Sequence, residues 1–540
     1  MRRKKYFSIT ILHILILFLS VNYPIADSSS TKIELAIDDP YMYINGEQYE
    51  IDPGRGTYPV IVNSRTLLPI RAIVENLGGT IEWDEAEKRV SIDYMNKLIE
   101  LWVDKDIISI NEKQEQIDQP PVIINSRTMV PVRFVAENMG CEVIWHEEGK
   151  RVEIIKEEVI IVEDEEFYDK ERPMFRGNLK HTGVYDTKGV HEGNEIKWKF
   201  ESDNNQPLVS SSPIIYRNII FVGCYDGNLY AIDIATREKK WKFKTEGSID
   251  STVAIENDIV YFGSLDGNLY AVDVETGEEK WRFETGDEIR SSPVVCSGSV
   301  YFGSNDGNLY AVDAETGEEK WRFKTNYKIY SSPSIYKDTI YFGSNDGNLY
   351  AVDIETGEEK WRFKTNGGVY SSPSIYKDTI YFGSFDGNLY AVDVETGEEK
   401  WRFKTNDIIM GSPAAYKDSV YIGSFDGSLY AVDAETGNEK WRFTAEVVWD
   451  LKFMTIDTDD RFINIHTPPS IAEDTVYFGS YNYMFYAVDV NTGKEKWRIE
   501  TWSPLWCSPL VKDGVVYYTS NRFLFAITDK KPVEPWIDWN

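Results

Sequence analysis

The stretch Tyr261–Val295, YFGSLDGNLYAVDVETGEEKWRFETGDEIRSSPVV, decides the fold because the chain repeats it almost unchanged. The unit returns every 40 residues, with its marker tyrosine at Tyr230, Tyr270, Tyr310, Tyr350, Tyr390 and Tyr430. After one insertion the marker returns at Tyr486, and Phe525 takes its place in the last unit. A period of about 40 residues that contains only strand signals predicts a propeller or another array of repeats.

Each unit divides into four short strands. In one copy these are SSPSIY, TIYFGS, NLYAVD and KWRFKT, which begin at Ser331, Thr339, Asn348 and Lys360. The Asp346-Gly347 pair between the second and third strands offers the positive φ angles of a tight hairpin. The strands are rich in Tyr, Phe, Val and Ile and alternate in polarity, as half-buried strands do. Four strands per unit predict a propeller blade.

The two ends of the repeat region are incomplete in complementary ways. KWKF at 197–200 carries a blade tryptophan without preceding strands, and the last unit, 507–529, has three strands but no tryptophan strand. The first strand can therefore complete the last blade, which joins the chain ends and removes exposed sheet edges. Seven full units and these two fragments predict a mainly β protein with an eight-bladed β-propeller.

The composition is that of a large acidic protein, with a formal net charge of -31 over 540 residues. A nucleic-acid partner is not expected, because binding to phosphates needs clustered Lys and Arg. Residues 1–26 start with four basic side chains and continue with an apolar run, which predicts a secretory signal. The alternative is an uncleaved membrane anchor, and a membrane contact is expected only through this segment.

The chain has four cysteines without a metal-binding spacing, at Cys141, Cys224, Cys296 and Cys507. Cys296 and Cys507 occupy repeat positions that hold small or apolar residues in other blades, so they are expected to be core side chains. A protein of this size does not need disulfides to build a stable core.

Residues 32–156 carry a different repeat, since VNSRTLLPIRAIVENLGGTIEWDEAEKRVSI at 62–92 matches INSRTMVPVRFVAENMGCEVIWHEEGKRVEI at 124–154. Each copy is expected to be a small α+β module of a hairpin, a helix (about Pro69 to Asn76 in the first copy) and a strand pair with a tryptophan. Recurring polar residues are assigned structural roles. Arg71 and Glu75, like Arg133 and Glu137, have the i, i+4 spacing of surface pairs, and the turns before the helices contain Asn63, Arg65, Asn125 and Arg127.

This segment resembles the copper amine oxidase N-terminal-like domain of secreted bacterial proteins, on the residues NSRTLLPIRAIVENLGGTIEWD and NSRTMVPVRFVAENMGCEVIWH. The family is named after the stalk of an oxidase and not after its copper site. His146 is the histidine of this segment, and a single histidine does not make a metal site. The resemblance implies an extracellular or envelope-associated accessory module without copper.

The repeat region, 173–529, resembles propellers of the pyrroloquinoline-quinone-like class. PMFRGNLKHTGVY at 173–185 is similar to the phrase that opens such propellers, and it follows a charged connector at 157–172. AVDVETGEEKW at 271–281 follows the tryptophan-docking pattern of the family. The resemblance implies that this tryptophan packs between neighbouring blades, which gives a structural role to Trp241, Trp281, Trp321, Trp361, Trp401, Trp441 and Trp497.

The resemblance implies two kinds of function. Quinoprotein dehydrogenases hold a quinone and a calcium ion over the ring centre, whereas BamB, a scaffold of outer-membrane β-barrel assembly, uses its blades as a docking surface. The alcohol dehydrogenases carry adjacent cysteines and long insertions, but this chain has no adjacent cysteines and its sizeable insertion is 444–467. Asp457, Asp459 and Asp460 offer a calcium alternative without a full ligand pattern. His466 is the candidate base of a sugar dehydrogenase.

Comparison of the blades within the chain identifies two variable positions, one before the SSP strand and one before Asp-Gly. Both lie at the same end of a four-stranded blade, so they are expected to ring one mouth of the central channel. The combination of aromatic residues with Met and Arg is typical of partner-binding patches, and drift in duplicated loops is the alternative explanation. The candidate residues are Tyr225, Arg290, Tyr330, Tyr370, Phe385, Met410, Phe425, His466 and Trp506.

These observations predict a non-enzymatic, secreted or cell-envelope protein whose propeller mouth docks a protein, a peptide or a cell-wall glycan. No catalytic residue, cofactor or metal is expected. The alternatives are a quinone-dependent dehydrogenase of alcohols or sugars and a structural spacer of the envelope. The expected domains are a signal peptide (1–26), the two-repeat domain (32–156), an acidic linker (157–172), the propeller (173–529) and a tail (530–540).

Overall fold

The computed structural model of the chain describes residues 30–529, except 64, 78, 95–96, 112, 126, 158–166, 169, 192–194, 209–210, 447–462 and 502. The chain divides after Ile160 into two compact units. The expected signal segment, the tail, Asp457, Asp459 and Asp460 lie outside the described residues. Within the described ranges, no helix has the length and apolar character needed to cross a membrane.

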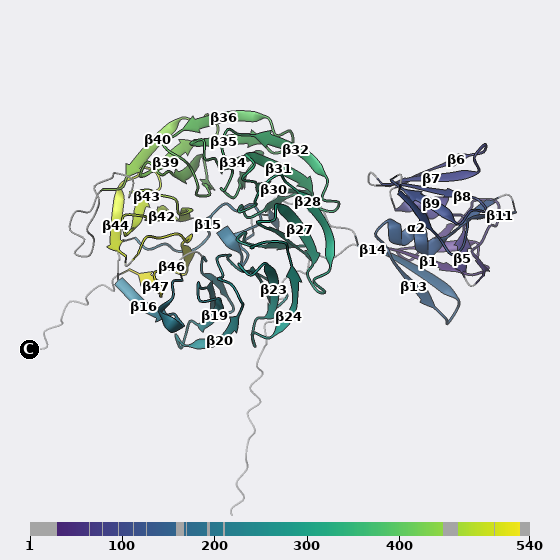
Figure 1. The fold of residues 1–540 in the computed structure, drawn as a ribbon, viewed down its shortest axis with the longest axis horizontal. Coiled ribbons are helices and arrows are strands. Elements are labelled where there is room, and N and C mark those ends of the chain that lie inside the picture. The colour runs from purple at the N-terminus through teal and green to yellow at the C-terminus, as the bar shows by residue number, and fades with distance from the viewer. Residues whose placement is uncertain are drawn as a thin grey trace, which may run out of the picture. The chain divides into compact units, whose positions relative to one another are not determined.

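The second unit is a ring of eight β-sheets, which confirms the predicted eight-bladed propeller (Figure 1). Six blades consist of four consecutive strands each. In the seventh blade a short strand from before the repeats adds to the inner edge, and in the eighth blade another early strand forms the outer edge. Neighbouring strands within a repeat pair antiparallel, as the hairpin signals predict.

The strand bounds follow the repeat. Blade 1 contains β17 (Ile214–Tyr216), β18 (Ile219–Gly223), β19 (Asn228–Asp233) and β20 (Lys239–Lys244). Blades 2 and 3 contain β21 (Ala254–Glu256), β22 (Ile259–Gly263), β23 (Asn268–Asp273), β24 (Glu279–Glu284), β25 (Val294–Cys296), β26 (Ser299–Gly303), β27 (Asn308–Asp313) and β28 (Glu319–Lys324). Blades 4 and 5 contain β29 (Ser334–Tyr336), β30 (Thr339–Gly343), β31 (Asn348–Asp353), β32 (Glu359–Lys364), β33 (Ser374–Tyr376), β34 (Thr379–Gly383), β35 (Asn388–Asp393) and β36 (Glu399–Lys404). Blades 6 to 8 contain β37 (Ala414–Tyr416), β38 (Ser419–Gly423), β39 (Ser428–Asp433), β40 (Glu439–Thr444), β41 (Ser470–Ala472), β42 (Thr475–Ser480), β43 (Met484–Asp489), β44 (Glu495–Glu500), β45 (Leu510–Lys512), β46 (Val515–Ser520) and β47 (Phe523–Thr528).

Strand β16 (Glu195–Glu201) closes the ring. It pairs antiparallel with β47, from Glu195 opposite Thr528 to Glu201 opposite Phe523. The first strand of the repeat region therefore forms the outer strand of blade 8, as the incomplete ends predict. Strand β15 (Val184–Tyr185) pairs parallel with β41 of blade 7.

The marker tyrosine of each blade has a structural reason. In blade 4, Gly347 has a φ of 85° and completes the hairpin turn. The Asp346 carboxylate accepts a hydrogen bond from the Asn348 N–H at 3.0 Å and another from the Tyr350 hydroxyl at 2.7 Å. One aspartate thus satisfies both the turn and the buried tyrosine, because a buried hydroxyl needs a partner.

A tryptophan joins each of blades 1 to 7 to the next blade. The Trp281 indole N–H and the Tyr261 hydroxyl both donate to the main-chain carbonyl of Ala314 in blade 3, each at 3.1 Å. The Trp281 ring lies against Gly317, where φ is 75° and an added Cβ would lie 2.6 Å from the ring. Other indole N–H groups donate to the following blade in the same way, at Trp241, Trp321, Trp401, Trp441 and Trp497. The Trp361 ring takes the same seat against Gly397.

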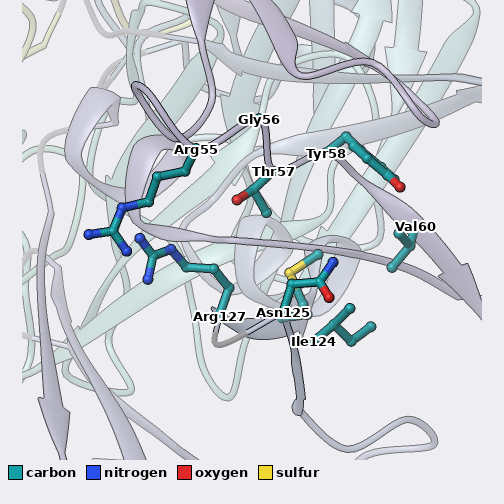
Figure 2. Close-up of a pocket in the computed structure, with 9 residues that line it drawn as sticks. Arg55, Gly56, Thr57, Tyr58, Val60, Ile124, Asn125 and Arg127 are labelled. Carbon is teal, nitrogen blue, oxygen red and sulfur yellow. The ribbon is translucent and has the colours of Figure 1, made fainter.

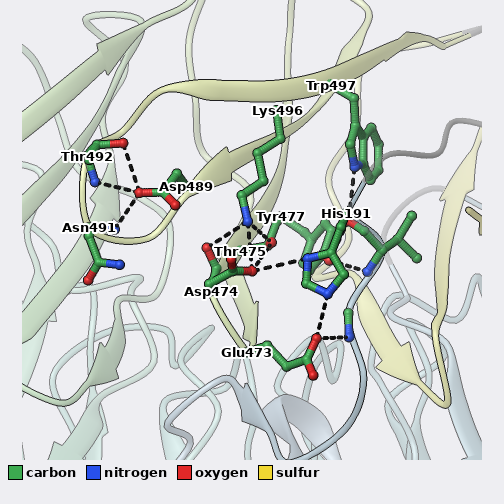
Figure 3. Close-up of polar contacts among 12 residues, drawn as sticks. His191, Glu473, Asp474, Thr475, Tyr477, Asp489, Asn491, Thr492, Lys496 and Trp497 are labelled. Atoms are coloured by element: carbon green, nitrogen blue, oxygen red, sulfur yellow. Dashed lines mark hydrogen bonds and ion pairs between the residues drawn. The ribbon is translucent and has the colours of Figure 1, made fainter.

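At the joint between blades 7 and 8, the segment before β16 replaces the missing hairpin turn (Figure 3). The Val190 carbonyl accepts hydrogen bonds from the Trp497 indole and the Tyr477 hydroxyl, both at 3.0 Å. It therefore takes the part that Ala314 plays between blades 2 and 3. His191 Nε2 lies 2.6 Å from a Glu473 carboxylate oxygen and fastens the segment to blade 7.

The hub of the ring is filled by the segment 173–183. Its carbonyls accept hydrogen bonds from the inner strands of five blades, at the N–H groups of Ile255, Ile335, Ile375, Ala415 and Ile471. The Arg176 guanidinium is only 1% exposed, and it donates to the carbonyls of His181 and Pro413 at 2.9 and 2.6 Å. Burial lowers the pKa of Arg176 to about 10. The opening phrase of the propeller thus supplies the acceptors that the inner strand edges need.

The first unit contains both copies of the other repeat, and its described residues form three sheets and two helices. Its elements are β1 (Ser30–Ala36), β2 (Tyr41–Ile44), β3 (Glu47–Glu50), β4 (Val60–Val62), β5 (Arg65–Leu68), α1 (Arg71–Asn76), β6 (Thr80–Asp84), β7 (Arg89–Tyr94), β8 (Lys97–Trp102), β9 (Ile107–Ile110), β10 (Lys113–Gln116), β11 (Val122–Ile124), β12 (Arg127–Pro131), α2 (Val132–Asn138), β13 (Glu142–His146) and β14 (Arg151–Glu157). The sheets have the orders β13-β14-β1-β2-β3, β10-β9-β8-β7-β6 and β11-β12-β5-β4. Short 3-10 helices, at Phe175–Gly177 and Asp203–Asn205, belong to the propeller unit.

The two copies exchange strands, which corrects the expectation that each copy is a separate module. Strand β1 opens the first copy but pairs with β14 at the end of the second, and the apolar side chains of both copies share one core. The helix of the first copy begins at Arg71 and not at Pro69, because Leu67 and Leu68 pair with β12. A hairpin alone cannot bury its apolar face, so each copy completes the other.

Recurring polar residues link the copies as well as forming turns. Arg65 Nε donates to Asp118 at 2.8 Å, and Arg127 Nε donates to Asp52 at 2.6 Å, so each arginine reaches the other copy. In the helices, Arg71 and Glu75 form an exposed i, i+4 pair at 3.1 Å. Arg133 and Glu137 repeat it at 3.8 Å.

Replacing Gly317 with alanine should destabilise the propeller more than replacing Gly298. Both glycines have a positive φ, but a Cβ at Gly298 meets nothing within 4 Å, whereas one at Gly317 meets Trp281. Gly298→Ala should cost about 1 kcal/mol of backbone strain, and Gly317→Ala a further 1–3 kcal/mol or so of overpacking. Urea unfolding of both variants measures the difference, and equal midpoints would contradict the proposed seat.

Candidate functional site

The fold brings the two variable positions of each blade to the same end. In blade 5 the N–H of Phe385, before Asp-Gly, donates to the carbonyl of Gly368, two residues before Tyr370. The equivalent bond in blade 6 joins Phe425 to Ile408. The hairpin turn and the linker into the first strand are therefore tied together by the main chain, and their variable side chains become neighbours.

Three aromatic side chains stack across blades 4 and 5. The ring centroids of Tyr330 and Tyr370 are 4.6 Å apart with 13° between the planes, and those of Tyr370 and Phe385 are 4.4 Å apart with 9° between the planes. All three residues are half-buried. Stacked rings of this kind form a rigid apolar surface with little conformational freedom left to lose on binding.

A charged group extends the stack into blades 2 and 3. The Arg290 guanidinium lies 6.0 Å from the Tyr330 ring centroid, over its face. It forms ion pairs with Asp250 and with Glu288, the latter at 3.0 Å. Burial raises the pKa of Asp250, although Arg290 opposes the shift.

A second aromatic cluster continues around blades 6 to 8. The His466 ring lies 4.2 Å from Trp506 and 5.7 Å from Phe425, measured between centroids. Tyr481 lies 6.0 Å from His466 and 5.9 Å from Trp506. Trp506 is 39% exposed. Together, the residues Arg290, Tyr330, Tyr370, Phe385, Phe425, Tyr481 and Trp506 are called the mouth arc below.

Among the predicted mouth residues, His466 is buried and does not present its ring to solvent. The residue is 5% exposed, because Trp506, Tyr481 and Phe425 surround it. Its Nδ1 lies 2.7 Å from Asn464 Oδ1, and its Nε2 has no hydrogen-bond partner among the described residues. Burial lowers the pKa of His466 to about 4, so the ring is neutral at pH 7.

The other two predicted mouth residues, Tyr225 and Met410, lie outside the two aromatic clusters. Tyr225 is 41% exposed in blade 1, and Met410 is half-buried in blade 6, each at its predicted blade position. The sequence comparison missed Tyr481, because blade 7 has Asn482-Tyr483 where blades 1 to 6 have Asp-Gly. The aromatic residues of blade 7 could have been aligned through Tyr486, the marker tyrosine.

The other candidate chemical groups have structural partners or are buried. The four cysteines are free and buried, and burial raises the pKa of Cys141 to about 11. His146 Nε2 lies 2.6 Å from a Glu153 carboxylate oxygen. In the described parts of the chain, no group of three or more His, Cys, Asp or Glu side chains could hold a metal ion.

Three family models match parts of the chain. The copper amine oxidase N-terminal domain matches residues 56–154. Outer membrane protein assembly factor BamB matches residues 331–536, and the β-propeller of β-alanine-activating enzyme matches residues 181–381. These matches confirm both resemblances. No curated protein sequence matches the chain.

Solved structures with a propeller fold match the chain over most of their own length. BamB from Moraxella catarrhalis is 18% identical with a TM-score of 0.52, covering 62% of this chain and 99% of its own. A europium-containing methanol dehydrogenase is 14% identical with a TM-score of 0.55, covering 68% and 100%. Quinohemoprotein alcohol dehydrogenase from Comamonas testosteroni is 14% identical with a TM-score of 0.54, covering 68% and 83%. At these identities the likeness establishes the fold, which binding proteins and enzymes share.

The free energy of unfolding should fall as the pH drops from about 6.5 to about 4, partly because of His466. Its pKa is lowered on folding, so the unfolded chain binds the proton more readily and acid favours unfolding. A shift from 6.5 to about 4 corresponds to roughly 3 kcal/mol. His466→Phe should flatten this part of the pH profile in urea unfolding, and an unchanged slope would contradict the buried, neutral ring.

Proposed function

Since the chain joins a pyrroloquinoline-quinone-like eight-bladed β-propeller to a copper amine oxidase N-terminal-like domain, we propose that it is a non-enzymatic binding protein of the cell envelope. The mouth arc docks a segment of a partner protein or peptide. The single observation that carries this proposal is the rigid stack of Tyr330, Tyr370 and Phe385 beside Arg290.

The chemistry of the mouth arc supports protein binding. Aromatic side chains and arginine supply most of the binding energy in protein interfaces. Blades 4 to 8 offer aromatic groups, and blades 2 and 3 offer the Asp250–Arg290–Glu288 ion pairs. A partner segment would therefore meet an apolar side and a charged side, which favours one orientation over the other.

The described mouth residues do not fit the quinone of the related dehydrogenases. A planar quinone needs an open space between rings, but Tyr330, Tyr370 and Phe385 already cover one another's faces at 4.6 and 4.4 Å. Arg290 is paired with two carboxylates, and His466 is buried as a supporting ring. These residues favour docking over redox chemistry.

The envelope location rests on the signal-like segment 1–26 and on the two kinds of domain. A BamB-like role in assembly is one form of this function, and capture of a cell-wall glycan is another, because aromatic rings also stack on sugars. A purely structural spacer would need no variable aromatic arc. Separate binding measurements with envelope proteins and with cell-wall glycan distinguish these partner classes.

Alanine at both Tyr330 and Phe385 should weaken partner capture roughly tenfold or more, because it removes the two outer rings of the stack. Trp506→Ala should weaken capture independently through the second cluster. The measurement compares binding of immobilised wild-type and variant protein to solubilised envelope proteins and to purified cell-wall glycan. Retention on the glycan alone would make the ligand a sugar.

The control is Tyr376→Ala, which removes a half-buried aromatic ring at the other end of β33. The Tyr376→Ala variant should capture partners as well as the wild type does. Its Tm should be close to the Tm values of the mouth variants, which shows that a loss of stability does not explain their weaker capture. If the mouth variants capture partners as well as the control does, the docking function is wrong.

A further inference from the structure

The first unit contains a pocket of about 130 Å³ that is lined by both copies of its repeat (Figure 2). One wall is the loop from Arg55 to Tyr58 and the start of β4. The other wall is the end of β11 and the start of β12, with Asn125 and Arg127. The pocket is small enough for one chemical group and too small for a complete sugar chain.

The pocket exists because the two copies differ at this point. The stretch from Asp52 to Arg65 is four residues longer than the equivalent stretch from Asp118 to Arg127. The additional length is the loop that contains Arg55 and Thr57, in which Gly54 and Gly56 have φ angles of 75° and 60°. The first copy therefore carries an additional loop that the fold of the repeat does not require.

Asp52 organises the basic side of the pocket. Its carboxylate accepts hydrogen bonds from Arg127 Nε at 2.6 Å and from the Thr57 hydroxyl at 2.8 Å. The hydrogen bond from Arg127 is the largest cause that lowers the pKa of Asp52, and the charge of Arg55 acts in the same direction. Two guanidinium groups thus lie within electrostatic range of one carboxylate, which leaves an excess positive charge at the pocket.

The side chains are arranged for an anion. Figure 2 shows the Arg55 and Arg127 guanidinium groups directed toward one another, with the Thr57 hydroxyl and the Asn125 amide on the same pocket. The Asp52 carboxylate balances one of these two positive charges, so a second negative group would be stabilised beside them. A planar guanidinium matches the oxygens of a carboxylate or a phosphate, and an amide group can add a further donor to such a site.

We propose that this pocket binds a small oxyanion group, a carboxylate or a phosphate, that projects from an envelope polymer. Arg55 is the main cation for the ligand, since Arg127 is already bonded to Asp52. Asn125 contributes an amide contact from the opposite wall, while the Thr57 hydroxyl stays bonded to Asp52. The pocket gives the first unit an attachment role that is independent of the propeller mouth.

The test is calorimetric titration of the full-length protein with inorganic phosphate and, separately, with acetate. At least one probe should bind saturably in the millimolar range. Arg55→Ala should weaken that binding at least about tenfold, because a charge-assisted pair is lost. Tighter binding of phosphate identifies a phosphate-bearing polymer as the source, and tighter binding of acetate identifies a carboxylated one.

A second variant removes the loop without relying on one side chain. Deletion of residues 55–58 gives the first copy the same loop length as the second copy. Because the second copy folds with this shorter loop, the deletion should leave the fold intact and abolish binding. Lys113→Ala is the control, because Lys113 is exposed on β10, and it should leave binding unchanged. Failure of both probes to saturate, or equal binding by wild type and Arg55→Ala, would overturn the proposal.

Discussion

The hydrogen bond from a blade tryptophan to a main-chain carbonyl of the next blade is the interaction on which the propeller depends. It recurs at Trp241, Trp281, Trp321, Trp401, Trp441 and Trp497, and the rings are seated against the next blade, as Trp281 is against Gly317. A closed ring needs a contact between every pair of neighbouring blades. At the joint between blades 7 and 8, blade 8 has no hairpin turn to offer a carbonyl. Val190 provides the missing carbonyl, so a residue from before the repeats completes a contact that the repeats define.

Because the contacts between blades are constant, the side chains of the mouth arc are free to vary. The side chains that hold the blades together are nearly identical from blade to blade, whereas the positions of the mouth arc vary between blades. The fold therefore fixes where these side chains lie and leaves their chemistry open. The result is asymmetric, with ion pairs at Arg290 on one side and aromatic rings from Tyr330 to Trp506 on the other.

Much of this arrangement could be predicted from the sequence, because the period, the Asp-Gly turns and the incomplete ends are local signals. The burial of His466 could not, since it depends on Trp506 and Tyr481 from two separate turns. The strand exchange in the first unit also escaped prediction. Repeats indicate which segments are similar but not whether a strand pairs with its own copy, as β1 and β14 illustrate.

Titration of the purified protein with pyrroloquinoline quinone and Ca²⁺, followed by quinone absorbance and thermal shift together, separates docking from redox catalysis most directly. The filled stack at Tyr330, Tyr370 and Phe385 predicts neither a saturable shift nor oxidation of alcohols or sugars with a dye acceptor. A saturable shift accompanied by dye-linked turnover would contradict the docking function and would identify the propeller as an enzyme.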